Sequence, residues 1–225
     1  MNPSTHTTPA PNPKGPIVLI DNRDSFVYNL VDALAAAGYP STVYRNTVTA
    51  EFVLSHNPSL VVLSPGPCHP RDAGNLMDIV AACLGKVPLL GICLGFQAIV
   101  EHCGGTVRPV GAVHGVTDLM RLTPAGHASG LFAGLTVDSP VPGQSGTQVP
   151  VARYHSLGCT TPPPGLQSLA TCASTAGEIT MAARSTDGLA LGFQFHPESV
   201  LSPSGPQILG RSIQQLLNSK GETHA

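Results

Sequence analysis

The segment "GICLGFQ" at residues 91–97 places a cysteine, Cys93, between two glycines. It follows the apolar run "VPLLGI" and precedes a stretch of helical character, which is the strand–turn–helix form of a nucleophile elbow with cysteine in place of serine. The N–H groups at a helix N-terminus carry partial positive charge, which favours a thiolate there. A cysteine that is simply packed at a strand end is the alternative for this segment alone. As a nucleophile, Cys93 would perform acyl transfer.

The segment "FQFHPES" at residues 193–199 supplies the partners that such a nucleophile needs. His196 follows an apolar strand pattern, and Glu198 lies two residues further, on the same side of an extended chain. Pro197 between them removes a backbone donor, as expected where a strand ends. An ordinary loop is the alternative for this segment alone. Combined with Cys93, it predicts a nucleophile, a base and an orienting carboxylate.

The segment "LSPGPC" at residues 63–68 has the form of an oxyanion-binding turn. Pro65 and Pro67 lack an N–H group, so the N–H of Gly66 between them is an isolated donor in a stiff turn. Together with the N–H of Leu94, the residue after the nucleophile, it would form an oxyanion hole. Without the other two segments, an ordinary proline-rich turn would be the better interpretation.

Alternating strands and helices must position these three segments. Apolar runs of strand type occupy residues 17–20, 41–45, 59–63 and 87–92. Each is followed by a stretch with helical spacing or composition, at residues 24–38, 50–56, 75–84 and 95–103. This alternation predicts an α/β fold with right-handed crossovers and a mostly parallel central sheet flanked by helices.

The pattern changes after Thr106. Strand-like segments then follow one another at residues 106–110, 117–122, 151–157, 166–174, 178–185 and 189–195. They predict a smaller antiparallel extension of the parallel sheet. Residues 138–150 have the composition of a surface loop, and residues 204–220 that of a closing amphipathic helix. We expect one domain over residues 17–225, preceded by a flexible, proline-rich leader at residues 1–16.

Composition and charge exclude several classes of protein. Hydrophobic residues make up 42% of the chain and charged residues 11%, which is typical of a compact globular protein. A formal net charge of −2 without a basic stripe argues against nucleic-acid binding. No apolar run reaches the roughly 18 residues of a membrane span, and the N-terminus lacks the apolar region of a signal peptide. The six cysteines, without paired spacing, favour free thiols in the cytoplasm, and no zinc-type spacing predicts a metal site.

Taken together, the motifs resemble those of the class I, triad-type glutamine amidotransferases. The resemblance rests on "DNRDSFVYNL", "SPGPC", "GICLGFQAIVE", "HG" at 114–115, "RYHSL" and "GFQFHPES", in family order over residues 17–218. The greatest similarity is to the small glutaminase subunits of anthranilate synthase and of aminodeoxychorismate synthase.

The resemblance implies a mechanism and a set of site residues. Cys93 attacks the side-chain amide of glutamine, His196 acts as base and acid, and Glu198 supports His196. The oxyanion lies on the N–H groups of Gly66 and Leu94. The residues implied to contact glutamine are Gly66, Pro67, Cys68, Gln97, Ser156 and Leu157. Ammonia then passes to a separate, chorismate-aminating synthase subunit in a hetero-oligomer. The resemblance implies no cofactor in the present chain and Mg²⁺ on the partner.

Several positions depart from the family pattern, and the pathway stays open. Val116 replaces the usual lysine, Arg23 the usual aromatic residue and Val27 the usual threonine, while residue 96 is Phe96 rather than histidine. We expect an anthranilate synthase subunit, with an aminodeoxychorismate synthase subunit, or one shared by both, as the alternative. An inactive, binding-only homologue is a further alternative that the intact Cys93, His196 and Glu198 disfavour.

Overall fold

The computed structural model describes residues 15–141 and 144–222, with side chains described as far as residue 219. A nine-stranded sheet dominates these residues, in the order β2-β1-β3-β4-β11-β10-β9-β6-β7. The strands that pair in parallel are β1 Ile17–Asp21, β2 Ser41–Arg45, β3 Leu60–Leu63, β4 Leu89–Ile92 and β11 Ala190–Phe193. Both faces of β1, β3, β4 and β11 are buried, which explains why these strands are predominantly apolar, whereas the edge strand β2 is partly exposed and carries polar residues.

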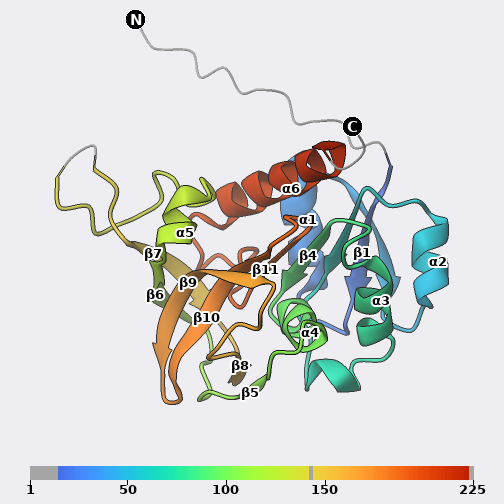
Figure 1. Ribbon diagram of the computed structural model, residues 1–225, viewed down its shortest axis with the longest axis horizontal. Coiled ribbons are helices and arrows are strands. Elements are labelled where there is room, and N and C mark those ends of the chain that lie inside the picture. The colour runs from blue at the N-terminus through green and yellow to red at the C-terminus, as the bar shows by residue number, and fades with distance from the viewer. Residues whose placement is uncertain (1–14, 142–143, 223–225) are drawn as a thin grey trace, which may run out of the picture.

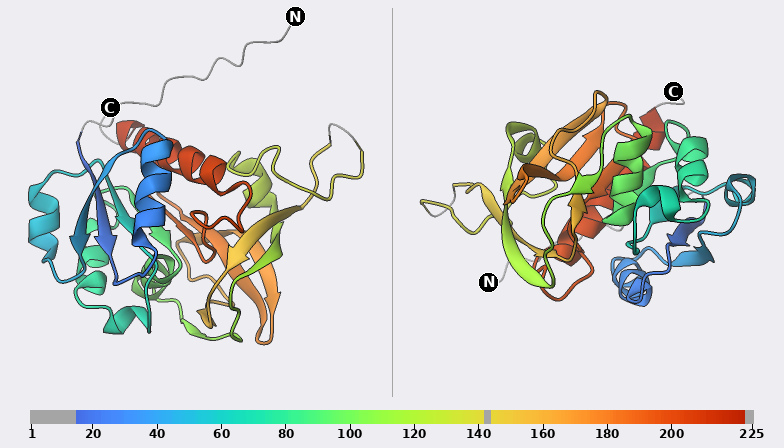
Figure 2. Two further views of the ribbon diagram at one scale, coloured as in Figure 1. Left: turned by 180° about the vertical axis from the view of Figure 1, so that it is seen from behind. Right: turned by 90° about the horizontal axis from the view of Figure 1, so that it is seen from below.

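Helices cover both faces of the parallel half (Figure 1). On one face lie α2 Ala50–Ser55, α3 Leu76–Cys83 and α4 Leu94–His102, and on the other lie α1 Val27–Ala36 and α6 Gly205–Glu222. The view from behind in Figure 2 brings α1 to the front, with α6 along the top. Within β1, Ile17 and Leu19 belong to the core beneath α1 and α6, whereas Val18 and Ile20 belong to the opposite core. This alternation is the two-residue period of a strand.

The rest of the sheet is antiparallel. Its strands are β6 Val116–Leu122, β7 Gln148–Arg153, β9 Leu166–Ser174 and β10 Gly177–Ser185. A separate two-stranded sheet pairs β5 Arg108–Pro109 with β8 Leu157–Gly158. The predicted α/β class, with a parallel core, flanking helices and an antiparallel extension, is therefore confirmed.

Several short elements, pairings and boundaries differ from the sequence-based expectation. The segment at 189–195 was expected in the antiparallel extension, but its strand β11 pairs in parallel with β4. β7 begins at Gln148, inside the loop expected at 138–150. The 3-10 helix Pro70–Asp72 and the helix α5 Pro124–Ala128 were not predicted, because a single turn shows too little periodicity. The expected strand at 151–157 is split into the end of β7 and the start of β8. Residues 1–14 of the expected leader and residues 142–143 of the expected loop lie outside the described residues. Gly15 and Pro16, placed with the leader, accept hydrogen bonds from Ser59.

Within the described part of the chain, no helix combines the length and the apolar character needed to cross a bilayer.

Candidate active site

Cys93 stands on a strained turn between β4 and α4. Its backbone has φ 49° and ψ −100°, a conformation that costs a non-glycine residue about 1–3 kcal/mol. The Cys93 N–H donates a 2.7 Å hydrogen bond to the carbonyl of Phe193 at the end of the neighbouring strand β11. The sharp turn, the following helix and the side chain's 7% exposure are the features of a nucleophile elbow.

The two glycines that flank the elbow are required by close backbone packing. A Cβ on Gly91 would lie 2.6 Å from the backbone carbon of Gly95, inside any real contact distance. A Cβ on Gly95 would lie 2.3 Å from the carbonyl oxygen of Leu63 on β3. Glycine at both positions therefore lets α4 start directly against the sheet.

His196 and Glu198 meet as the spacing of "HPE" predicts. His196 Nδ1 and Glu198 Oε1 are 2.7 Å apart, and the two side chains are 14% and 3% exposed. The His196 N–H donates to the carbonyl of Ala152 on β7, which fixes the chain beyond the end of β11. The Tyr154 ring packs edge-on against the imidazole with centroids 5.2 Å apart. The base is therefore held by its backbone, its carboxylate and an aromatic ring.

The electrostatics of His196 favour its charged form. Burial by itself lowers the pKa of His196, but interactions with the Cys93 thiol and with Glu198 outweigh burial and raise the pKa well above 6.5. His196 Nε2 is buried and has no hydrogen-bond partner among the described residues. With Nδ1 engaged by Glu198, Nε2 is the nitrogen that remains for proton exchange with the nucleophile or a substrate.

The turn at Gly66 packs directly on the elbow. A Cβ on Gly66 would lie 2.5 Å from the carbonyl oxygen of Asn22 and 2.9 Å from a methyl group of Leu94. Asn22 also holds Ser64, two residues before Gly66, by donating its Nδ2 to the Ser64 carbonyl at 2.8 Å. The two N–H groups predicted to hold an oxyanion thus belong to residues whose atoms pack close together.

A network of amides lies on the other side of Cys93. Gln194 Nε2 is 3.6 Å from Cys93 Sγ, in position to donate to the sulfur. Gln97 Nε2 donates both to Gln194 Oε1, at 3.1 Å, and to the carbonyl of Leu157, at 3.0 Å. Because both N–H donors of Gln97 are used within the protein, its carbonyl oxygen is the atom that remains for a ligand's donor.

A cavity of about 460 Å³ adjoins the nucleophile. Gly66, Pro67, Cys93, His196 and Glu198 line it, so five of the sequence-predicted site residues share one cavity. The other predicted residues that do not line it are Cys68, Leu94, Gln97, Ser156 and Leu157. Gln97 and Leu157 are joined to each other as described above, whereas the exposed Cys68 and Ser156 stay predictions that rest on the motifs. In residues 15–141 and 144–222, no group of three or more His, Cys, Asp or Glu side chains is placed to hold a metal ion.

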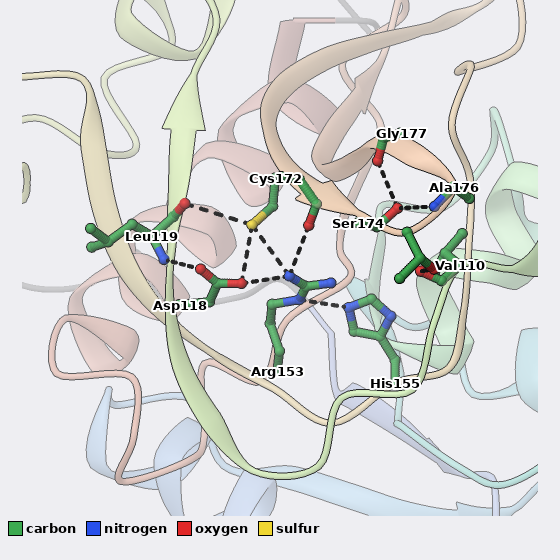
Figure 3. Close-up of polar contacts among 11 residues, drawn as sticks. Val110, Asp118, Leu119, Arg153, His155, Cys172, Ser174, Ala176 and Gly177 are labelled. Atoms are coloured by element: carbon green, nitrogen blue, oxygen red, sulfur yellow. Dashed lines mark hydrogen bonds and ion pairs between the residues drawn. The ribbon is translucent and has the colours of Figure 1, made fainter.

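A buried arginine anchors the segment that leads to Leu157. Figure 3 shows the Arg153 guanidinium between β6, β9 and the chain beyond β7. Arg153 Nη1 is 2.5 Å from Asp118 Oδ2 and donates to the carbonyl of Ala173 at 3.2 Å. Arg153 Nε donates to His155 Nε2 at 3.2 Å. The guanidinium therefore ties the end of β7 to two other strands.

The contact with Arg153 fixes the tautomer of His155. An arginine N–H can only donate, so Nε2 of His155 accepts and its Nδ1 carries the proton. That Nδ1–H then donates to the carbonyl of Leu157 at 3.0 Å. Leu157 is held from both sides, by His155 and by Gln97, and Gln97 connects through Gln194 to Cys93.

The buried, neutral His155 predicts that stability falls in mild acid. Burial, followed by the charge of Arg153, lowers the pKa of His155 from 6.5 to about 4. The unfolded chain binds more protons than the folded chain between these values, so stability decreases as the pH falls from 6.5 to about 4. A shift of this size corresponds to about 3 kcal/mol. The pKa of His196 is raised instead of lowered, so its contribution to stability is lost as the pH rises above 6.5, outside this window.

Urea unfolding across this pH window checks the prediction. We expect His155→Gln to be less stable than the wild type at neutral pH but to lose less stability on acidification. The control is His102→Gln, at an exposed position on α4, which keeps the wild-type slope. An equal loss of stability in the wild type and in His155→Gln would contradict the assignment of His155.

Sequence reasoning missed several residues that adjoin the site. Gln194 lies two residues before His196 and four before Glu198, so the period of an extended strand could have placed it on their side. Arg153 and Tyr154 stood in the quoted "RYHSL" motif without an assigned role. Asp24, which lines the cavity, stood in the quoted "DNRDSFVYNL" motif, also without an assigned role.

The comparisons place this fold and site in a known family. The family model for glutamine amidotransferase class-I matches residues 18–216. The chain belongs to the class-I glutamine amidotransferase family.

Two relatives with assigned names and one solved structure are similar to this chain over most of its length. Anthranilate synthase component 2 of Corynebacterium glutamicum is 60% identical over 203 residues, covering 89% of this chain and 98% of the relative. The protein of the same name from Vibrio parahaemolyticus is 39% identical, with 89% and 96% covered. A crystal structure of a Thermoplasma acidophilum protein, assigned as one of the subunits of a GMP synthase, gives a TM-score of 0.75. It covers 94% of this chain and 98% of that chain at 18% identity, which shows the shared fold alone.

Proposed function

We propose that the chain is the glutamine-hydrolysing subunit of an anthranilate synthase. The observation that carries this proposal is the meeting of Cys93, on a strained elbow, with the His196–Glu198 pair in one cavity. The 60% identity to an anthranilate synthase component 2 over nearly all of both chains supports this enzyme over other members of the family. It also favours tryptophan biosynthesis over the folate pathway.

The geometry supports acyl transfer by a cysteine nucleophile. His196 takes the proton of the Cys93 thiol, and the sulfur attacks the side-chain carbonyl of glutamine. The carbon–sulfur bond forms first and leaves a negative charge on the carbonyl oxygen. When the carbonyl reforms, the carbon–nitrogen bond breaks, and His196 gives its proton to the nitrogen, which leaves as ammonia. Water then attacks the thioester and releases glutamate and the thiol. Glu198 keeps the imidazole oriented and stabilises its charged form throughout.

Two sets of residues are proposed to hold glutamine and its oxyanion. The N–H groups of Gly66 and Leu94 hold the oxyanion, since their residues pack against each other beside Cys93. The free carbonyl oxygen of Gln97 accepts a hydrogen bond from the α-ammonium group of glutamine. Pro67, Cys68, Ser156 and the fixed Leu157 complete the proposed contacts.

The ammonia is used by a second subunit. The name of the relatives, component 2 of an anthranilate synthase, implies a partner synthase subunit. We propose in addition that this partner aminates chorismate and binds Mg²⁺, and that this chain needs no cofactor. The exposed side chains of Phe26, Tyr154 and Val200 around the cavity suit a covering partner surface, because apolar groups there are 63%, 43% and 95% exposed. The six cysteines, all free in the structure, support the proposal of a cytoplasmic location.

Mixing the purified chain with candidate partners tests this function. The large subunits of anthranilate synthase and of aminodeoxychorismate synthase from the same source each receive the chain, chorismate, magnesium and glutamine. We expect glutamine-dependent anthranilate, identified by mass and fluorescence, from the first mixture. Aminodeoxychorismate from the second mixture alone would contradict the pathway, and product in both would indicate a shared subunit.

A further inference from the structure

The cavity beside Cys93 extends past the triad toward the start of α1. The residues that line it beyond the triad include Asp24, from the loop between β1 and α1, and Tyr154. Cys93, His196 and Glu198 line the same space, so a molecule leaving the nucleophile on the His196 side enters this cavity. The exposed Phe26 and Val200 also line it, which places its outer end at the surface.

Two carboxylate oxygens in this cavity lack hydrogen-bond partners. Glu198 uses Oε1 for His196, whereas its Oε2 is buried and unpartnered among the described residues, on a side chain that is 3% exposed. Asp24 Oδ1 accepts from the Phe26 N–H at 3.2 Å, whereas Asp24 Oδ2 is buried and likewise unpartnered. Buried acceptors without a donor are unfavourable, so both oxygens suit a ligand that supplies N–H groups.

The charges in the cavity also favour such a ligand. Burial raises the pKa of Asp24, the backbone N–H of Phe26 lowers it, the negative charge of Glu198 raises it and His196 lowers it. The charges of Glu198 and His196 therefore both act on Asp24, which lines the same cavity. Arg23 lines the cavity as well, but it is exposed and forms no ion pair with any described residue. No cation within residues 15–141 and 144–222 is thus paired with the two free oxygens.

We propose that Asp24 Oδ2 and Glu198 Oε2 hold the nitrogen released from glutamine, as ammonia or ammonium, before it passes to the partner subunit. The inference rests on the proposed function, since that reaction supplies the ligand. His196 gives its proton from Nε2 to the leaving nitrogen, and the nitrogen enters the cavity that Asp24 and Glu198 line together with His196. Ammonia and ammonium carry three and four N–H donors, which match the two unpartnered acceptor oxygens.

Competition between two nitrogen sources in the assembled synthase tests this proposal. The complex receives chorismate, glutamine labelled with the heavy nitrogen isotope at its amide, and unlabelled ammonium in solution. Mass spectrometry then measures the ratio of labelled to unlabelled anthranilate. This ratio compares two sources in one product, so it does not depend on the overall rate.

The variant is Asp24→Asn, which keeps an oxygen for the Phe26 N–H and replaces the free oxygen by a donor. We expect the labelled-to-unlabelled ratio to fall by about tenfold, the scale set by one charge-assisted hydrogen bond. Asp24→Ser, which also keeps an acceptor for Phe26, gives the same direction if Asn disturbs the loop. The matched control, Asp32→Asn at an exposed position on α1 away from the cavity, keeps the wild-type ratio.

The possible outcomes are distinct. A ratio in both Asp24 variants equal to that of the wild type overturns the proposal. Loss of glutamate release in folded Asp24 variants also overturns it, because Asp24 would then act in amide cleavage rather than on the released nitrogen. Absence of labelled anthranilate from the wild type would instead refute the proposed function itself.

Discussion

Cys93→Ser is expected to lower glutamine-dependent anthranilate synthesis by about four orders of magnitude or more. Serine fits the same elbow, but its hydroxyl ionises far less readily than a thiol, so the geometry remains while the nucleophile is lost. Synthesis from ammonium should be unchanged, because that reaction takes place on the partner. Both rates are measured on the purified complex with a saturating large subunit.

The control for this substitution is Cys103→Ser, at a partly buried thiol just after α4, outside the cavity. We expect it to retain both activities. Loss of both activities in a folded Cys93→Ser complex would contradict the model in which this chain only supplies ammonia to the partner. Full glutamine use by Cys93→Ser would instead identify the chain as a scaffold without a catalytic role.

Glu198→Gln is expected to slow glutamine turnover by about a hundredfold to a thousandfold, less than Cys93→Ser. The amide retains an oxygen that can accept from His196 Nδ1, but it loses the charge that stabilises the imidazolium. It can also present its NH₂ group to Nδ1, which favours the wrong tautomer. A smaller loss than that of the nucleophile is therefore expected.

The pH profile separates an electrostatic role of Glu198 from a structural one. Glu198 is one of the groups that raise the pKa of His196, so Glu198→Gln lowers that pKa. Since the protonated imidazole must donate to the leaving nitrogen, the alkaline limb of turnover should move to lower pH. Glu178→Gln, at an exposed position on β10, serves as the control with an unmoved limb. Losses equal to those of Cys93→Ser, or an unmoved limb, would contradict this account.

Most of the parallel core was predictable because its signals are local. Four of its strands lie at or near the expected residues, each followed by a helix, and in the antiparallel part β9 coincides with the expected residues 166–174. The parallel pairing of β11 with β4 was not expected, because it depends on the strand order. The prediction of one strand over residues 151–157 was wrong, because contacts between residues far apart in the sequence interrupt it. Arg153 and His155 turn inward to bind β6, β9 and Leu157, and these contacts end β7 at Arg153.

The site also contains residues that local motifs reveal and residues that only the fold reveals. Cys93 and the His196–Glu198 pair could be found because a short motif surrounds each of them. The hydrogen bond that Gln194 donates to Cys93 joins two residues that are 101 positions apart in the sequence. Asp24, near the N-terminus, lines the cavity together with residues near the C-terminus. Such pairs are brought together by the strand order, so one sequence without its fold does not reveal them.

The hydrogen bond from Cys93 to Phe193 has a consequence for engineering. Because β4 and β11 are adjacent and in fixed register, the sheet brings the ends of the strands that carry nucleophile and base side by side. The chain between them, from α4 through β10, contributes further strands, and β7 also holds His196 through Ala152. The lengths of the surface connections between those elements are therefore free design parameters, whereas the elements themselves are not. A tether or reporter could be inserted in such a surface connection while the chemistry at its base is conserved.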